Sequence, residues 1–169
     1  MLACRALFAC LCVWLLVGSP ARAGAPALEE TCVVRGAKVP VQYDGSRRYF
    51  AEAGPPRGSM PRSGVVYVIY INPERTYLGR QTQQWLYLRQ CAHINDQHKV
   101  VTAGASALSI RDEEAADCSA ARRISPEGLS SKTLYGIESD MGRVVREGRW
   151  GEVLPGPERR ISFASSCGK

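Results

Sequence analysis

The stretch Trp85-Leu86-Tyr87-Leu88-Arg89-Gln90-Cys91-Ala92-His93-Ile94-Asn95-Asp96-Gln97-His98 decides how the rest of the chain is organised. Within it, Trp85, Leu88 and Ala92 recur at the spacing of one helix face. This periodicity predicts a helix from about residue 77 to residue 94. We therefore expect an apolar helix that carries a polar cluster at its end.

Two polar side chains, Arg89 and His93, lie on the apolar stripe of this helix. A guanidinium on an inward face is unusual, because the burial of an unpaired charge is costly. In the alternative arrangement, Arg89 packs only its aliphatic stem on the core and extends its charged head to the rim. The pattern alone leaves both arrangements open.

A second polar cluster, Glu113-Glu114-Ala115-Ala116-Asp117-Cys118, begins fifteen residues after His98. Asp112 precedes it, and an acidic first turn interacts favourably with the helix dipole. We predict one helix from about residue 112 to 123 and another from about 131 to 146. The second has apolar residues along one side: Leu134, Ile137, Met141, Val144 and Val145.

The best strand in the sequence is Val65-Val66-Tyr67-Val68-Ile69-Tyr70-Ile71, which is β-branched and aromatic throughout and stops at Asn72-Pro73. Because it is apolar on both faces, we expect it to lie inside or against the core. Shorter strands are predicted at residues 33–34 and 39–43, the latter ending at an Asp-Gly turn. Residues 49–53 form too short a run to assign.

The first 23 residues have the pattern of a secretory signal. An early arginine gives a charged start, residues 6–17 are apolar, and Ala21-Arg22-Ala23 is a typical cleavage site. The apolar run is well short of the ~20 residues that a membrane span needs. We therefore predict a signal peptide at 1–23, a flexible leader at 24–31 and a single domain at 32–169.

This signal predicts a secreted or periplasmic product that has no membrane contact after cleavage. The mature chain keeps 20 basic and 16 acidic residues, which gives a net charge of +4. Its short basic clusters, Arg47-Arg48 and Arg122-Arg123, have no aromatic ladder beside them. We therefore expect no nucleic-acid partner.

The cysteines indicate disulfide bonds. Three of the seven leave with the signal, and an even number in an exported chain predicts two disulfides with three possible pairings. A zinc site of four cysteines is the alternative, but the gaps between them contain no Cys-x2-Cys pair. The four that remain are Cys32, Cys91, Cys118 and Cys167.

Together, the two polar clusters resemble the small secreted relatives of neutral zinc metallopeptidases. In that family the active-site helix reads His-Glu-Cys-x-His-x-x-x-Gly-His, and the next helix reads Glu-x-x-Ala-Asp-Cys. The segments Ile71-Asn72-Pro73 and Pro155–Arg159 are similar as well, so the resemblance covers about residues 65–167. It implies a zincin-like α+β fold with helices packed on a small sheet. This chain keeps the following motif positions: Cys91, His93, His98, Glu113, Ala116, Asp117 and Cys118.

This chain departs from the family pattern at the residues that bind zinc and activate water. Arg89 stands at the position of the first histidine ligand, and arginine cannot lose its proton to bind zinc. Gln90 stands at the position of the glutamate base, which in the family activates the metal-bound water. Only His93 and Glu113 survive from a three-ligand set. The resemblance therefore implies a degenerate site with no catalytic residue, and we expect no cofactor.

An altered ligand set is the alternative. His98 lies five residues after His93, about 140° around a helix, so the two cannot chelate one ion from a straight helix. If the helix ends near Asn95, His98 can return toward His93 and Glu113, with Asp117 nearby. The chain would then be a zinc-dependent peptidase with His93, His98 and Glu113 as its metal ligands.

The resemblance also implies contacts between the two helices. If Glu113 faces the space that zinc fills in the family, the Arg89 guanidinium can replace the cation in a bidentate pair, with His93 hydrogen-bonded beside it. Asp117 would then orient His93 or cap a turn. The same picture places Cys91 opposite Cys118, so we expect the disulfides Cys91–Cys118 and Cys32–Cys167.

These residues predict an exported, metallopeptidase-like protein that has lost zinc-dependent proteolysis and has a binding or structural role. The partner class under this hypothesis is a peptide or protein, and the sequence identifies no particular one. A third hypothesis is a small disulfide-bonded binding domain whose motif similarity is accidental. It explains fewer of the matching segments than the other two.

Overall fold

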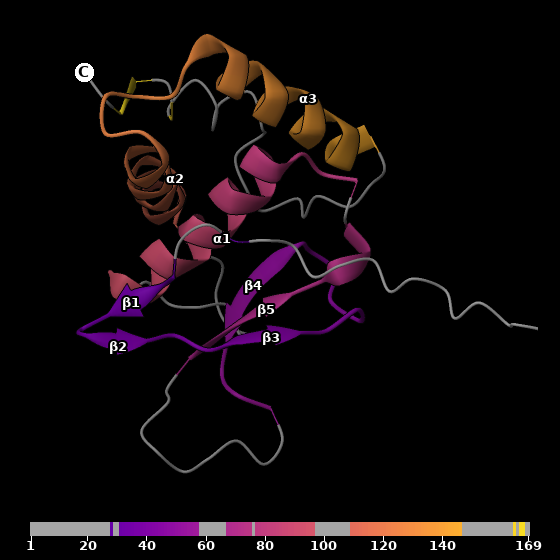
Figure 1. Cartoon of the computed structure of the whole chain (residues 1–169), viewed down its shortest axis with the longest axis vertical. Coiled ribbons are helices and arrows are strands. Elements are labelled where there is room, and N and C mark those ends of the chain that lie inside the picture. Colours follow the sequence, from indigo (N-terminus) through magenta and orange to yellow (C-terminus); the bar gives the residue numbers. More distant parts are fainter. Residues whose placement is uncertain are drawn as a thin grey trace, which may run out of the picture.

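A computed structural model describes residues 28, 31–57, 67–75, 77–96, 109–146, 164 and 166–167 of the chain (Figure 1). The predicted signal peptide at 1–23 lies outside the described residues, as does His98. In the described part, no helix is both long enough and apolar enough to cross a bilayer.

The strands form a hairpin and a small mixed sheet. In the sheet β5 is central, with β3 parallel on one side and β4 antiparallel on the other. All four residues of β5 are buried, which confirms that this part of the strand predicted at 65–71 lies in the core. Residues 65 and 66 lie outside the described residues. The described strands are β1 (Val33–Val34), β2 (Ala37–Lys38), β3 (Val41–Tyr43), β4 (Ala51–Gly54) and β5 (Val68–Ile71).

The β1–β2 hairpin turns through two residues with positive φ, Arg35 at 51° and Gly36 at 78°. Such a pair gives the backbone twist that joins two antiparallel strands with a two-residue loop. The strand predicted at 39–43 begins only at Val41, after Pro40. This correction has a physical reason, because proline has no N–H to donate to a sheet.

Within the described ranges, three helices lie on one side of the sheet, so the fold is α+β: α1 (Arg80–Asn95), α2 (Ile110–Ile124) and α3 (Ser131–Arg146). A short 3-10 turn, η1 (Pro73–Arg75), connects β5 to the segment before α1. Figure 1 shows α1 lying between the sheet and the other two helices. A helix in that position is buried on more than one side. The predicted bounds of α3 are confirmed, whereas α1 starts three residues later than expected.

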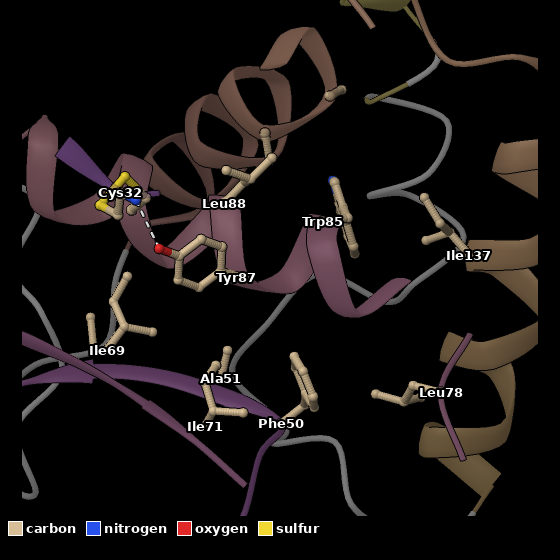
Figure 2. Packing of buried hydrophobic residues seen from close by; sticks show 14 of the residues in the cluster. Cys32, Phe50, Ala51, Ile69, Ile71, Leu78, Trp85, Tyr87, Leu88 and Ile137 are labelled. Carbon is tan, nitrogen blue, oxygen red and sulfur yellow. Dashed lines mark hydrogen bonds between the residues drawn. A yellow bond between two sulfur atoms is a disulfide. The ribbon is translucent and has the colours of Figure 1, made fainter. Parts of the chain in front are cut away.

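The main core lies where α1 packs on the sheet. Tyr87 and Leu88 of α1 lie above Ile69 and Ile71 of β5 (Figure 2). Trp85 is on the same helix and packs in the same core cluster, toward Ile137 of α3. Burial of each such side chain contributes roughly 1.5–3 kcal/mol, so these contacts hold the central helix in place.

The N-termini of the helices are capped in two different ways. In α2, Ser109 and Asp112 form a capping box, each side chain bonding the backbone N–H of the other. In α1 the N-cap residue is Gly79, and the cap comes from α3 instead. One oxygen of Asp140 accepts the N–H of Gly79 at 2.7 Å and the hydroxyl of Thr82 at 2.6 Å. This carboxylate fixes the start of α1 against α3.

The disulfides are Cys32–Cys91 and Cys118–Cys167. The expected pairing of Cys91 with Cys118 and of Cys32 with Cys167 is therefore wrong. The reason lies in helix geometry. Cys91 is two residues from Arg89, about 200° around the helix, so it does not share the face that carries Arg89 and His93 to α2. On that other side it reaches the chain just before β1.

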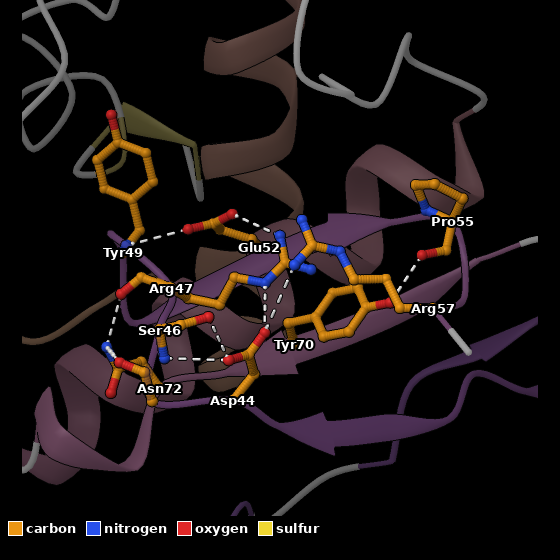
Figure 3. Close-up of polar contacts among 10 residues, drawn as sticks. Asp44, Ser46, Arg47, Tyr49, Glu52, Pro55, Arg57, Tyr70 and Asn72 are labelled. Atoms are coloured by element: carbon orange, nitrogen blue, oxygen red, sulfur yellow. Dashed lines mark hydrogen bonds and ion pairs between the residues drawn. The ribbon is translucent and has the colours of Figure 1, made fainter.

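The second face of the sheet is covered by long polar side chains (Figure 3). The Arg47 guanidinium lies 3.8 Å from the centroid of the Tyr70 ring and pairs with Asp44 at 3.1 Å and Glu52 at 3.2 Å. The pKa of Asp44 is lowered from its ordinary value, chiefly because the Ser46 hydroxyl donates a hydrogen bond to the carboxylate. The buried Tyr70 ring is thus shielded by an arginine that two carboxylates hold.

Candidate functional site

The candidate site is a cluster of charged side chains between α1 and α2. Arg89 and His93 are four residues apart on α1, and Glu113 and Asp117 are four residues apart on α2. Residues at this spacing lie on one face of a helix, so each helix presents a pair to the other. Arg89 is only 6% exposed and the other three at most 1%, so the cluster is almost completely shielded from solvent.

The Arg89 guanidinium lies between two carboxylates. Its Nη2 forms an ion pair with Oε2 of Glu113, and its Nε lies 3.2 Å from Oδ1 of Asp117. The other oxygen of Glu113 lies 3.8 Å from Nε2 of His93. The expected ion pair between Arg89 and Glu113 is confirmed. The 3.8 Å between His93 and Glu113 is too long for the hydrogen bond that was expected beside it. The alternative in which the Arg89 head reaches the rim is wrong.

The partner of Asp117 differs in part from the expectation. We expected this carboxylate to orient His93 or to cap a turn, and the structure places it against Arg89. The guanidinium therefore divides its contacts between two carboxylates instead of bonding Glu113 alone. The spacing of Glu113 and Asp117 on one face of α2 contained the signal for this arrangement.

Gln90, at the position of the family's catalytic base, is bonded to the sheet. Its Oε1 accepts a hydrogen bond from the backbone N–H of Ala53 in β4 at 3.0 Å. The outer edge of β4 is thereby connected to α1. Sequence reasoning missed this contact because nothing was assigned at residues 49–53.

The described side chains do not fit a catalytic zinc ion. The ion needs three protein ligands and a water, and a guanidinium cannot act as a ligand. Of the family's ligand positions, His93 and Glu113 keep conventional ligand types, and Glu113 is already paired with Arg89. Within the described ranges, no group of three or more His, Cys, Asp or Glu side chains is arranged to hold a metal.

No family model, curated protein or solved structure matches this chain. The metallopeptidase resemblance therefore rests on the motif residues of the sequence. His98, the remaining candidate ligand, lies outside the described residues.

In chemical terms, the cluster is a set of opposite charges buried between two helices. A guanidinium remains charged at any working pH, and an ion pair of low exposure is screened little by solvent. Such a cluster can hold two helices in one relative position. The family's base position holds Gln90, and the part of the chain that the structure describes holds no metal-binding group of three or more His, Cys, Asp or Glu side chains.

Proposed function

We propose that the chain is an exported metallopeptidase-like protein that has lost zinc-dependent proteolysis and acts by binding or as a structural scaffold. One observation carries this proposal. The residue at the position of the first zinc ligand, Arg89, is a buried permanent cation paired with Glu113 and Asp117. It supplies at this place the positive charge that zinc supplies in the family.

The residue at the next position, Gln90, also supports the loss of proteolysis. In the family, a glutamate next to the first ligand takes a proton from the metal-bound water. Gln90 has no such basicity, and its side-chain oxygen accepts the N–H of Ala53. Arg89 and Gln90 thus replace the two residues that hydrolysis needs in the family. The helix that carries them, α1, still packs in the core.

Export is supported by the covalent structure. Two disulfides connect the four cysteines at 32, 91, 118 and 167. Disulfides persist in oxidising compartments such as the periplasm or the extracellular space and are rare in the cytosol. This agrees with the N-terminal pattern of the sequence.

The test compares the native protein with the double variant Arg89→His, Gln90→Glu. We expect the native protein to contain no stoichiometric zinc after purification and to show no chelator-sensitive cleavage of casein. The double variant offers two histidines at the spacing of zinc-binding helices, together with Glu113, and we expect it to retain zinc.

Arg89→Lys with Gln90→Glu is the matched control, because it keeps a cation at the ligand position and should bind no zinc. Stoichiometric zinc with chelator-sensitive cleavage in the native protein would overturn the loss of proteolysis. A double variant that folds but takes up no more zinc than the control would overturn the descent from a metallopeptidase site.

A further inference from the structure

Arg123, in the last turn of α2, contacts the Cys32–Cys91 disulfide. Its Nη1 donates to Sγ of Cys91 at 3.0 Å, and its Nη2 donates to the carbonyl oxygen of Thr31 at 3.5 Å. One guanidinium thus touches both the sulfur of α1 and the residue immediately before Cys32. Neither the metallopeptidase resemblance nor the proposed function uses this arginine.

The other side of the bond is also held by a side chain. The hydroxyl oxygen of Tyr87 accepts the N–H of Cys32 at 2.8 Å, and both cysteines are fully buried (Figure 2). Tyr87 lies one turn before Cys91 on α1. Non-covalent contacts from two helices therefore position the chain at Cys32 next to Cys91.

We propose that Arg123 directs the closure of the Cys32–Cys91 disulfide, by stabilising the Cys91 thiolate and by holding Thr31 beside it. The thiolate is the nucleophile in disulfide formation, and a neighbouring arginine favours it over the thiol. Arg123 reaches Cys91 through the packing of α1 against α2, two helices that are consecutive in the chain. Such local packing forms more readily than the distant contact with residue 32.

The reaction needs a disulfide oxidant, such as oxidised glutathione. The Cys91 thiolate attacks one sulfur of the oxidant, the oxidant's S–S bond breaks, and one thiolate leaves. The Cys32 thiolate then attacks the Cys91 sulfur of the mixed disulfide, and the second thiolate leaves. The two cysteines lose two electrons to the oxidant and release their two protons to solvent.

The neighbouring arginine provides a matched control. Arg122 donates from its Nε to the backbone carbonyl oxygen of Cys167 at 2.8 Å. It has the same charge and lies on the same helix turn. This contact is with a carbonyl oxygen instead of a sulfur, so removing Arg122 should leave Cys91 unaffected.

The first experiment measures the ionisation of Cys91 directly. The variant Cys32→Ser, expressed with the predicted signal peptide at 1–23, leaves Cys91 as a free thiol. Its ionisation is followed by the ultraviolet absorbance of the thiolate. Adding Arg123→Gln should raise the titration midpoint by at least about one pH unit. Arg122→Gln should leave the midpoint unchanged. Arg123→Lys keeps a positive charge, so its midpoint should lie between those of Arg123 and Arg123→Gln. An equal midpoint with and without Arg123 would overturn the proposal.

The second experiment retains all the cysteines, so it does not depend on how Cys32→Ser folds. The reduced protein is refolded in a glutathione buffer, and the two disulfides are followed by quenching and peptide mapping. A rise of one unit in the pKa of Cys91 leaves about tenfold less thiolate at a given pH, but each remaining thiolate is more nucleophilic. Together, these two effects should make Arg123→Gln slow the formation of the Cys32–Cys91 bond about threefold. Cys118–Cys167 should close at the native rate. Equal slowing of both bonds, or of neither, would overturn the proposal.

Discussion

At the scale of single residues, Arg89 is the centre of the molecule's polar interior. It lies on the helix that the sheet, α2 and α3 all surround, and its two carboxylate partners come from α2. Burying an ion pair costs desolvation free energy. The attraction between the two partners offsets this cost only while both charges are present. Removing the cation should therefore cost more than removing an ordinary surface arginine.

We expect Arg89→Ala to lower the free energy of unfolding by roughly 3–5 kcal/mol, because it leaves the Glu113 and Asp117 carboxylates buried without this cation. Chemical denaturation monitored by circular dichroism measures the change. Arg111→Ala, an exposed arginine at the start of α2, should change stability by no more than about 0.5 kcal/mol.

A second substitution tests the cause. Glu113→Gln in the Arg89→Ala background removes one of the unbalanced charges, so the double variant should be more stable than Arg89→Ala alone. If Arg89→Ala unfolds at the same denaturant concentration as the native protein, the buried pair does not hold the two helices together.

Much of this cluster could be predicted from the sequence, but its details could not. Helical spacing places Arg89 and His93 on one face, and the motif resemblance places Glu113 opposite them. How a guanidinium divides its donors between Glu113 and Asp117 depends on the crossing of α1 and α2. That crossing is set by core side chains such as Leu88 and Ala120 and has no local signature.

At the scale of elements, α1 determines how the sheet and the other helices pack together, because each of its sides contacts a different element. One side carries Arg89 and His93 toward α2, and another carries Tyr87 and Cys91 toward the sheet and β1. A sequence reading that considers one face at a time misassigns residues on the other. For this reason the pairing of Cys91 with Cys118 that the motif resemblance implies is wrong.

We expect Tyr87→Phe to lower the free energy of unfolding by roughly 1–3 kcal/mol, because it leaves the buried N–H of Cys32 without its acceptor. The loss should be largest near β1, where hydrogen exchange at the Cys32 amide should accelerate. The matched control is Tyr135→Phe, since Tyr135 is 74% exposed on α3. Equal stability of the two variants would contradict the role given to the Tyr87 hydroxyl.

Elements with strong periodicity were predictable, and short ones were not. The bounds of α3 follow from Ile137, Met141 and Val144 on one side of a helix. β4 was missed because Ala51-Glu52-Ala53-Gly54 has little intrinsic strand preference. Pairing with β5 and the contact between Gln90 and Ala53 make it a strand, and both are tertiary effects.

At the scale of the whole molecule, the two disulfides tie the ends of the domain to its helices. Cys32–Cys91 connects the chain before β1 to α1, and Cys118–Cys167 connects α2 to the C-terminal segment. The bonds span 59 and 49 residues. Because loop entropy grows slowly with length, the two closures should contribute similarly, about 4 kcal/mol each.

We therefore expect Cys32→Ala with Cys91→Ala, and Cys118→Ala with Cys167→Ala, to lower the free energy of unfolding by comparable amounts, within the ~2–5 kcal/mol usual for native disulfides. Denaturant titration of the two paired variants measures this. Peptide mapping without reduction should recover fragments linked 32 to 91 and 118 to 167. A fragment linking Cys91 to Cys118 would contradict the fold.

Our central proposal is that Arg89 stands in the place that a metal ion occupies in the metallopeptidases this sequence resembles. It is tested most directly by the melting temperature of the native chain after dialysis against a strong chelator, and again after zinc is added back. If no metal is bound, as we propose, none contributes to folding, and we expect the two values to agree within about 1 °C. A bound zinc at about 100 times its dissociation constant would contribute about 2.7 kcal/mol. A fall of several degrees in chelator, reversed by zinc, would contradict the claim.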